Sequence, residues 1–212
     1  MNTAHTLIAK HGRTFAEEAG ITLRDKPAPL WQLLVLSLLL STRIDAKIAT
    51  RSAHELYVAG WRTPQRLLSS TWQQRVDALG RGGYRRYDES TATRLAEAAE
   101  HILTQWQGDL RKLHAQAPKD PERIAELLQT FKGIGPVGAS IFLREVQVIW
   151  TDIRPYIDDL AVQGATALGL PTRADELFDQ VDPADFHRLV AACVRCALHP
   201  SLCGDLDSAG KA

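Results

Sequence analysis

Hydrophobic residues recur along this chain mostly at helical spacing, and prolines and glycines divide the sequence into segments of helical length. Leu95, Ala98, Ala99, Ile102 and Leu103 form one such stripe, which indicates a helix with one buried face. No segment alternates apolar and polar residues as a half-buried strand does. The pattern predicts an all-α protein. The expected helices are Thr3–Ala19, Leu30–Leu40, Ala46–Ala59, Pro64–Ser69, Trp72–Leu79, Asp88–Gln105, Pro121–Thr130, Val137–Val148, Asp158–Leu168, Ala174–Phe178 and Pro183–Leu198.

The stretch Phe131–Ala139 reads Phe-Lys-Gly-Ile-Gly-Pro-Val-Gly-Ala, which is typical of a tight hairpin that opens directly into a helix. Gly133 and Gly135 have no Cβ, so a phosphate can approach their backbone N–H groups closely. Pro136 suits the first helical position, and the positive end of the helix favours an anion there. The stretch predicts a backbone clamp for a nucleic-acid phosphate, with an ordinary glycine-rich turn between packed helices as the alternative.

Composition limits the range of partners. The 212 residues carry 25 basic and 25 acidic side chains, so the net charge of zero argues against a globally basic nucleic-acid binder but permits a local basic face. Positive charge gathers at Arg81, Arg85, Arg86 and Lys132. The most apolar run, Leu33–Leu40, is too short to cross a bilayer, and no signal peptide is evident, so we expect a cytoplasmic protein with no membrane partner.

Four segments, taken in order, resemble the helix-hairpin-helix DNA glycosylases, and most closely their endonuclease III branch. Leu38–Asp45 is similar to the helix end and loop from which a polar side chain enters the DNA, and Gly80–Arg94 to the turn and helix before the hairpin. Phe131–Ala139 is similar to the hairpin itself. Ile157–Leu160, followed by Leu168–Leu170, is similar to the segment that bears the catalytic aspartate. Together these segments extend the resemblance over most of the chain.

The resemblance implies a two-lobed all-α fold with a central cleft, made of a central lobe at residues 45–131 and a second lobe at residues 1–44 plus 132–212. The implied partner is double-stranded DNA with a damaged base, which must leave the stack to be reached. The protein would act as a monomer and, in a bacterium, would associate with the nucleoid. Arg43 would fill the space that the base vacates. The residues implied in DNA binding are Arg43, Arg85, Arg86, Lys132, Gly133, Ile134, Gly135, Val137 and Gly138.

The resemblance places the catalytic aspartate at Asp158, because Leu168–Leu170 aligns with the end of the family's motif without a gap. Breaking an N-glycosidic bond builds positive charge on the deoxyribose, which an ionised carboxylate can stabilise. Asp159 is the near alternative, since a slip of one residue would exchange the two. The competing interpretation of Asp158 is an N-cap for the following helix, and one residue can serve both purposes.

Family members that also cleave the DNA strand carry a Schiff-base lysine in the helix after the hairpin, and Val137 stands at that position here. Valine cannot form an imine. The resemblance therefore implies a monofunctional glycosylase that leaves an intact abasic site, or else a lyase that uses another lysine, such as Lys132. The residues are also compatible with a non-enzymatic DNA-binding protein of the same fold and with a purely structural helical protein. No short motif names the damaged base.

The three cysteines do not make a disulfide framework. Cys196 and Cys203 reproduce the first interval of the family's four-cysteine iron–sulfur motif, but the next two positions hold Leu206 and Ala212, which cannot bind iron. We therefore expect no cofactor and no metal, with buried or surface thiols at a helix end. The alternative is a three-cysteine site for zinc or a cluster, completed by His199.

Overall fold

The computed structural model describes residues 3–203, and every regular element among them is a helix. The prediction of an all-α protein is confirmed. In chain order the elements are α1 (Thr3–His11), α2 (Phe15–Glu18), α3 (Pro27–Leu40), α4 (Ala46–Val58), α5 (Pro64–Leu68), α6 (Trp72–Gly82), α7 (Asp88–Trp106), α8 (Leu110–His114), α9 (Pro121–Leu128), α10 (Pro136–Val146), the 3₁₀ helix η1 (Thr151–Ile153), α11 (Asp159–Ala167), α12 (Ala174–Phe178), α13 (Phe186–Leu198) and the 3₁₀ helix η2 (Pro200–Leu202).

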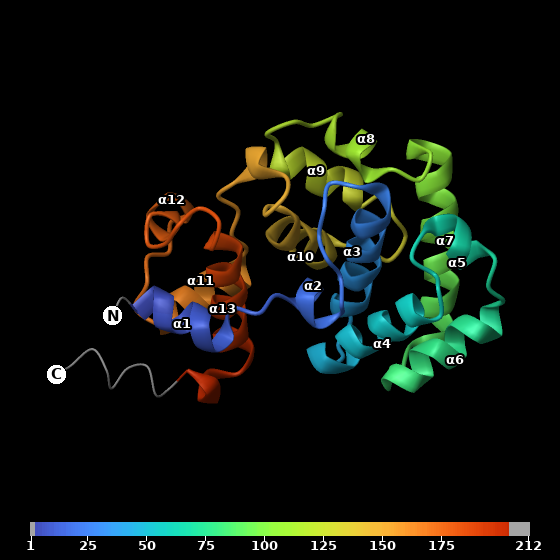
Figure 1. Ribbon diagram of the computed structural model, residues 1–212, viewed down its shortest axis with the longest axis horizontal. Helices are drawn as coiled ribbons and strands as arrows, with labels where there is room; N and C mark the ends of the chain where they lie inside the picture. Colours follow the sequence, from blue (N-terminus) through green and yellow to red (C-terminus); the bar gives the residue numbers. More distant parts are fainter. Residues whose placement is uncertain (1–2, 204–212) are drawn as a thin grey trace.

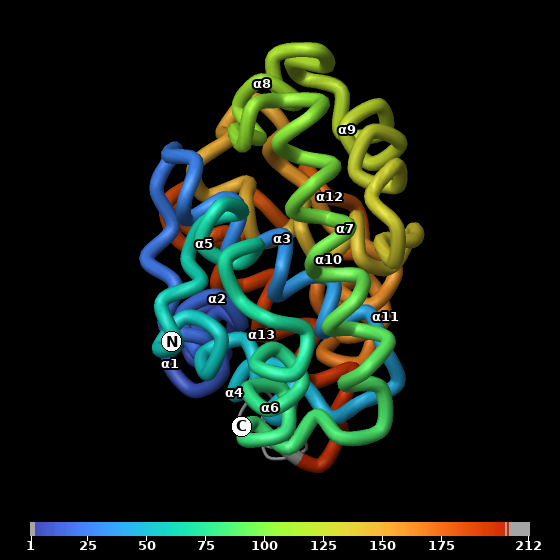
Figure 2. The backbone as a smooth tube through the Cα atoms, turned by 90° about the vertical axis from the view of Figure 1, so that its right-hand side faces the viewer, coloured from blue at the N-terminus to red at the C-terminus, as the bar shows by residue number. Residues whose placement is uncertain are grey.

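The helices form two groups, with α10 joining them (Figure 1). At one end, α1 and α11 pack against α13, so the first helix of the chain lies among the last ones. At the other end α3 packs on α4, α4 on α6, and α6 on α7, which runs along that side from α8 to α6 (Figure 2). α10 contacts both α3 and α13. The predicted lobe boundaries at residues 45 and 131 stay a prediction.

α3 is the central helix of the larger group, and every residue from Leu30 to Leu39 is buried. A helix that is apolar on all sides is stable in water only when neighbours cover it, and here α4 and α10 do so. Its C-terminal end at Leu40 leads into the loop that carries Arg43. No helix among residues 3–203 combines the length and the apolar composition needed to cross a membrane.

The predicted helix Thr3–Ala19 is wrong in one respect, because the chain leaves α1 after His11 and starts α2 at Phe15. Thr14 begins α2 with a capping box: its hydroxyl accepts the Glu17 N–H at 3.1 Å, and the Glu17 carboxylate accepts the Thr14 N–H at 3.1 Å. These two hydrogen bonds favour a new helix start over continuation of the first helix. The break places Phe15 in the wall of the main cleft.

Two other predicted helices begin with a proline that follows an aspartate. α9 starts at Pro121 as predicted, and Asp120 caps it by accepting the Arg123 N–H at 2.9 Å. The helix predicted from Pro183 instead begins at Phe186, because Asp182 accepts the Ala184 N–H at 2.9 Å within a turn. The hydrophobic pattern also does not predict α8 or η1, which are shorter than two helical turns.

α11 and α13 cross closely at Gly164. A Cβ built on Gly164 would overlap the carbonyl oxygen of Cys193 in α13. The crossing therefore depends on the absence of a side chain at this position. The crossing therefore fixes the position of α11 along α13. The first turn of α11 borders the cleft.

We expect Gly164→Ala to lower the free energy of unfolding by about 1–3 kcal/mol, because the two helices must separate to admit a methyl group. Gly80→Ala is the matched control, since Gly80 also lies within a helix but no atom lies within 4 Å of a Cβ built there. Alanine at that position should be neutral or stabilise by up to about 1 kcal/mol. Urea denaturation measures both, and equal effects would contradict the close crossing.

Candidate active site

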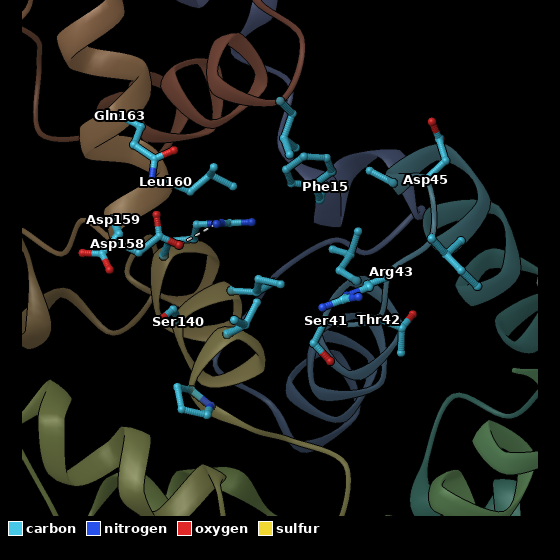
Figure 3. Close-up of a pocket in the computed structure, with 18 of the residues that line it drawn as sticks. Phe15, Ser41, Thr42, Arg43, Asp45, Ser140, Asp158, Asp159, Leu160 and Gln163 are labelled. Carbon is cyan, nitrogen blue, oxygen red and sulfur yellow. Dashed lines mark hydrogen bonds and ion pairs between the residues drawn. The ribbon is translucent and has the colours of Figure 1, made fainter.

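A cleft of about 560 Å³ lies where the two helix groups meet. The first turns of α11 form one side, and Phe15 with the loop Ser41–Asp45 forms the other (Figure 3). The first two turns of α10 make the floor between them, and Leu198 and His199 at the end of α13 also line the cleft. Most of the lining surface is apolar, which suits the flat face of an aromatic ring.

Asp158 stands at the N-terminus of α11, with both carboxylate oxygens engaged. Oδ1 accepts the Ala161 N–H at 2.9 Å, so Asp158 is the N-cap of this helix. Oδ2 accepts a hydrogen bond from Arg144 Nη1 at 2.6 Å. Asp158 therefore caps a helix and lines the cleft at once. The N-cap interpretation is confirmed, and the catalytic role of Asp158 stays a prediction.

Arg144 lies in α10 and is the ion-pair partner of Asp158. The side chains of Arg144 and Asp158 are 6% and 10% exposed. Arg144 Nε is buried with no acceptor in the part of the chain that the structure describes, and the guanidinium lies 5.8 Å from the centre of the Phe15 ring. An arginine inside the apolar run Ser-Ile-Phe-Leu-Arg-Glu-Val is the signal in the sequence that could have pointed to it.

The segment before Asp158 is fixed by Gln147, a fully buried residue just after α10. Its Oε1 accepts the Tyr156 N–H at 3.0 Å, and its Nε2 donates to the Tyr156 carbonyl at 2.9 Å and to the Arg144 carbonyl at 3.0 Å. The Tyr156 hydroxyl donates to Ser140 Oγ at 3.2 Å, and burial raises the pKa of Tyr156. The chain segment that precedes Asp158 is therefore held against α10 by several hydrogen bonds.

Glu145 follows Arg144 in α10 and binds a different element. Its carboxylate accepts the N–H groups of Phe15 at 3.3 Å and Ala16 at 3.1 Å, which belong to the first turn of α2. Burial raises the pKa of Glu145 above the usual range of a glutamate, while these hydrogen bonds and Arg144 oppose the shift. This contact attaches Phe15, and with it one wall of the cleft, to α10.

Asp159 is the first residue of α11 and is exposed. It also borders the cleft, but its carboxyl group points away from the opposite wall, whereas that of Asp158 lies on the cleft side (Figure 3). The structure thus gives the two neighbouring aspartates different surroundings: Asp158 is partly buried and paired with a cation, and Asp159 is open to solvent.

Arg43 lies across the cleft from Asp158, in the loop after α3, and its side chain is exposed (Figure 3). The loop is supported from beneath, because the Thr42 hydroxyl lies 2.6 Å from the hydroxyl of the buried Tyr84 and donates to the Leu39 carbonyl at 2.8 Å. Asp45 ends the loop by capping α4 through the Lys47 N–H at 2.8 Å.

The structure does not bring Arg85 and Arg86 into the cleft. Both side chains are exposed in the turn after α6, where the Arg86 guanidinium lies 5.2 Å from the centre of the Tyr87 ring. Arg85 borders a separate, shallow depression beside α6. The two arginines therefore belong to the outer surface, near the base of the Arg43 loop through Tyr84.

The hairpin before α10 has the features that the sequence predicts. Gly133 has a φ of +95°, and Phe131 and Ile134 are buried anchors. Gly135 is the N-cap of α10 and provides no side-chain acceptor, and nothing lies within 4 Å of a Cβ built there. Lys132 forms an ion pair with Glu97 of α7 at 2.6 Å, so its charge is partly neutralised.

Gly138 and Val137 differ in exposure. Gly138 is buried where α10 passes the loop after α3, because a Cβ there would lie 3.4 Å from the Ser41 Cβ and 3.3 Å from Ile134. Val137 is 62% exposed and lines the cleft. An exposed valine is thus present where the resemblance places a lysine in strand-cleaving relatives.

The prediction of free thiols is wrong for Cys196 and Cys203, which form a disulfide. The end of α13 and η2 fold back on each other, which brings the two Cα atoms to 5.7 Å. Leu198 and His199 lie within the loop that this bridge closes. Cys193 is a buried free thiol, and burial raises its pKa to about 12.

The positions of the other two expected iron ligands, Leu206 and Ala212, lie outside the described residues. Within residues 3–203 no group of three or more His, Cys, Asp or Glu side chains is arranged to hold a metal ion. The disulfide also engages two of the three cysteines that the alternative site with His199 would need.

Comparison with solved structures gives a similar fold in a trapped endonuclease III–DNA covalent intermediate, an estranged-adenine complex. The TM-score is 0.50, the match covers 92% of this chain and 86% of the other, and the two sequences are 14% identical. At this identity the likeness shows the fold alone, and the predicted all-α fold of the endonuclease III kind is confirmed. No protein-family model matches the sequence, and no curated protein matches it either.

Proposed function

We propose that this protein is a DNA repair glycosylase that removes a damaged base from double-stranded DNA by hydrolysis of the N-glycosidic bond. The observation that carries the proposal is the position of Asp158, a carboxylate with 10% of its side chain exposed that is paired with a cation at the edge of an apolar cleft. The same cleft begins at the first turn of α10, directly after the glycine hairpin. The likeness to endonuclease III adds support at the level of the fold.

In this proposal the damaged base leaves the stack and enters the cleft, where apolar walls receive its faces. Positive charge then develops on the deoxyribose as the bond to the base lengthens, and Asp158 opposes that charge or activates the attacking water. Arg43, on the opposite wall, is long and planar enough to occupy the gap left in the duplex.

The hairpin supplies the anchor on the DNA backbone. Because Gly135 has no side chain to cap α10, the N–H groups at the start of this helix have no side-chain acceptor and remain free for a phosphate. The open space around Gly135 lets the phosphate come close. Contacts of this kind hold DNA without reading its sequence.

We further propose that the enzyme is monofunctional. Val137 cannot form an imine, and no lysine lines the cleft among the residues that the structure describes. Lys132, the candidate amine suggested by the sequence, is held by Glu97. Lys47 borders an adjoining depression of about 190 Å³ that shares Phe15, Leu198 and His199 with the cleft, and it is the candidate amine if lyase activity exists.

One observation favours a second candidate, a DNA-binding protein without catalysis. Both oxygens of Asp158 already have donors, and the charge of Arg144 offsets the negative field that would stabilise the sugar cation. A protein of this kind would use the same hairpin and the same Arg43 loop but would leave the base attached.

Asp158→Asn should slow base excision by about 100-fold or more, because asparagine keeps the volume and the helix cap but loses the charge. Asp159→Asn is the matched control, since it makes the same chemical change one residue along the chain at an exposed position, and its effect should be small. The measurement is single-turnover excision from a panel of duplexes with one lesion each, followed by alkali to reveal abasic sites.

The outcomes of this comparison are distinct. If Asp159→Asn is the inactive variant, the two aspartates exchange roles. Excision by both variants at the wild-type rate would remove the aspartate from the mechanism. If the wild-type protein binds the duplexes but releases no base from any lesion, the result favours the non-catalytic DNA-binding protein.

Gly135→Val should weaken binding to all duplexes, damaged or not, while leaving the melting temperature unchanged. The backbone at Gly135, with φ −100° and ψ −168°, accepts any residue, and the added side chain meets only the space where the phosphate would lie. Thr104→Val, at an exposed position of α7, controls for added surface hydrophobicity. Fluorescence anisotropy with an undamaged duplex measures the change, and equal affinity in wild type and Gly135→Val would contradict the clamp.

Borohydride should trap no covalent protein–DNA adduct during excision, because trapping requires an imine formed by an amine in the cleft. The assay uses a lesion duplex from which the wild type releases the base, with gel separation of the products. An efficient adduct would overturn the monofunctional proposal. Loss of that adduct in Lys47→Ala but not in Lys132→Ala would then identify the amine.

A further inference from the structure

The carboxylate of Asp158 is largely shielded from solvent, and each of its oxygens has one protein donor. Because 10% of the side chain is exposed, water solvates the ionised form only weakly. Burial alone favours the protonated form of a carboxyl group, which would be useless against a developing cation. The N–H of Ala161 and the guanidinium of Arg144 are the two donors that counter this effect within the described residues.

Several titratable or charged groups surround Asp158. They are Arg144 of α10, Asp159 of α11, Tyr156 in the preceding segment, Arg43 and Asp45 on the opposite loop, and His199 at the end of α13. Arg144 differs from the rest, because it is the cation in hydrogen-bond contact with the carboxylate and is buried with it. The other acid next to it, Glu145, is turned to the backbone of α2.

Arg144 is itself held in place. It projects from the interior of α10, and its guanidinium lies beside the ring of Phe15. Its carbonyl accepts from Gln147, the residue that also fixes Tyr156 and the approach to Asp158. Nη1 of Arg144 donates to Asp158, and its Nε is buried without an acceptor among the described residues, so the polar contact of this guanidinium that the structure shows in the cleft is the one with the carboxylate.

We propose that Arg144 is the positioning residue of the cleft: it keeps Asp158 ionised and fixes the direction of its carboxylate. The inference rests on the proposed glycosylase function for its catalytic consequence. The pairing of charges also has a consequence that can be measured without activity, which is the pH at which Asp158 takes up its proton. In Arg144→Gln a buried carboxylate remains without its cation, so it should bind that proton at a higher pH.

The first measurement is a carboxyl ¹³C NMR titration of the whole protein, in which the Asp158 signal is identified by its absence from Asp158→Asn. In Arg144→Gln the midpoint for Asp158 should rise by about one pH unit or more. Arg144→Lys keeps the charge, so the midpoint for Asp158 should stay close to its wild-type value. An unchanged midpoint in a folded Arg144→Gln protein would overturn the inference, whether or not the protein is an enzyme.

The second measurement is the pH profile of single-turnover excision on the duplex from which the wild type releases the base. The acid limb of Arg144→Gln should move to higher pH with the NMR midpoint, and the plateau rate should fall by roughly tenfold or more as the carboxylate loses its fixed direction. Arg144→Lys should recover the acid limb but not the full rate, because an ammonium lacks the planar geometry of the guanidinium.

Arg75→Gln is the matched control for loss of a buried arginine. Arg75 is 7% exposed and donates to the Ala92 and Ser70 carbonyls at 3.0 and 2.9 Å, but it lies in α6 away from the cleft. This variant should lower the melting temperature without moving the acid limb. A faster Arg144→Gln enzyme, or an acid limb that moves equally in Arg75→Gln, would contradict the positioning role. Wild-type excision by Asp158→Asn would instead count against the proposed function.

Discussion

The buried ion pair between Arg144 and Asp158 is the contact on which the arrangement of the cleft depends. Desolvation of two charges is costly, and a buried pair is often no more stabilising than apolar residues of the same size. Its value here is geometric. In one stretch of α10 and the residue after it, Arg144 binds the N-terminus of α11, Glu145 binds the N-terminus of α2, and Gln147 binds the segment before Asp158. Three separate parts of the chain are thus positioned by neighbouring side chains of one helix.

The same helix carries the hairpin at its other end. α10 has 11 residues, so its length is about 16 Å at a rise of 1.5 Å per residue. The glycine turn and the aspartate are therefore fixed relative to each other by a rigid element of modest length, and not by a flexible loop. On the opposite wall Tyr84 supports the Arg43 loop, and on the Asp158 side the close crossing at Gly164 sets the position of α11 on α13. Such a cleft can keep its shape when a nucleotide enters it.

Local chemistry explains what could be predicted from the sequence. Gly133, Gly135 and Pro136 predict the hairpin because a positive φ and a missing N–H are properties of single residues, and the N-cap role of Asp158 follows from its place before a helix. The choice of Asp158 as the candidate catalytic residue comes from the resemblance. The apolar pattern continues through Thr14 and so hides the break there, although the Thr-x-x-Glu box marks it. Arg144 and the Cys196–Cys203 bridge could not be predicted in the same way. Each depends on which residues meet in space, and no spacing in the sequence encodes the meeting of α10 with α11 or the fold-back of η2 onto α13.

Charge gives the last constraint on how such a protein can hold DNA. Its 25 basic residues are matched by 25 acidic ones, and Lys132 beside the hairpin is paired with Glu97, which partly neutralises its charge. Attraction to phosphates must then come largely from fixed dipoles at the start of α10 and from a few exposed arginines such as Arg43, Arg85 and Arg86. Few released counterions mean weak binding to ordinary duplex and a shallow dependence on salt. A protein that binds undamaged DNA so weakly must gain its selectivity for damaged DNA at the cleft. An extruded base can fit there, and a paired base cannot enter. Under the proposed function, selectivity for a damaged base therefore depends on the cleft and its carboxylate more than on the charge of the surface.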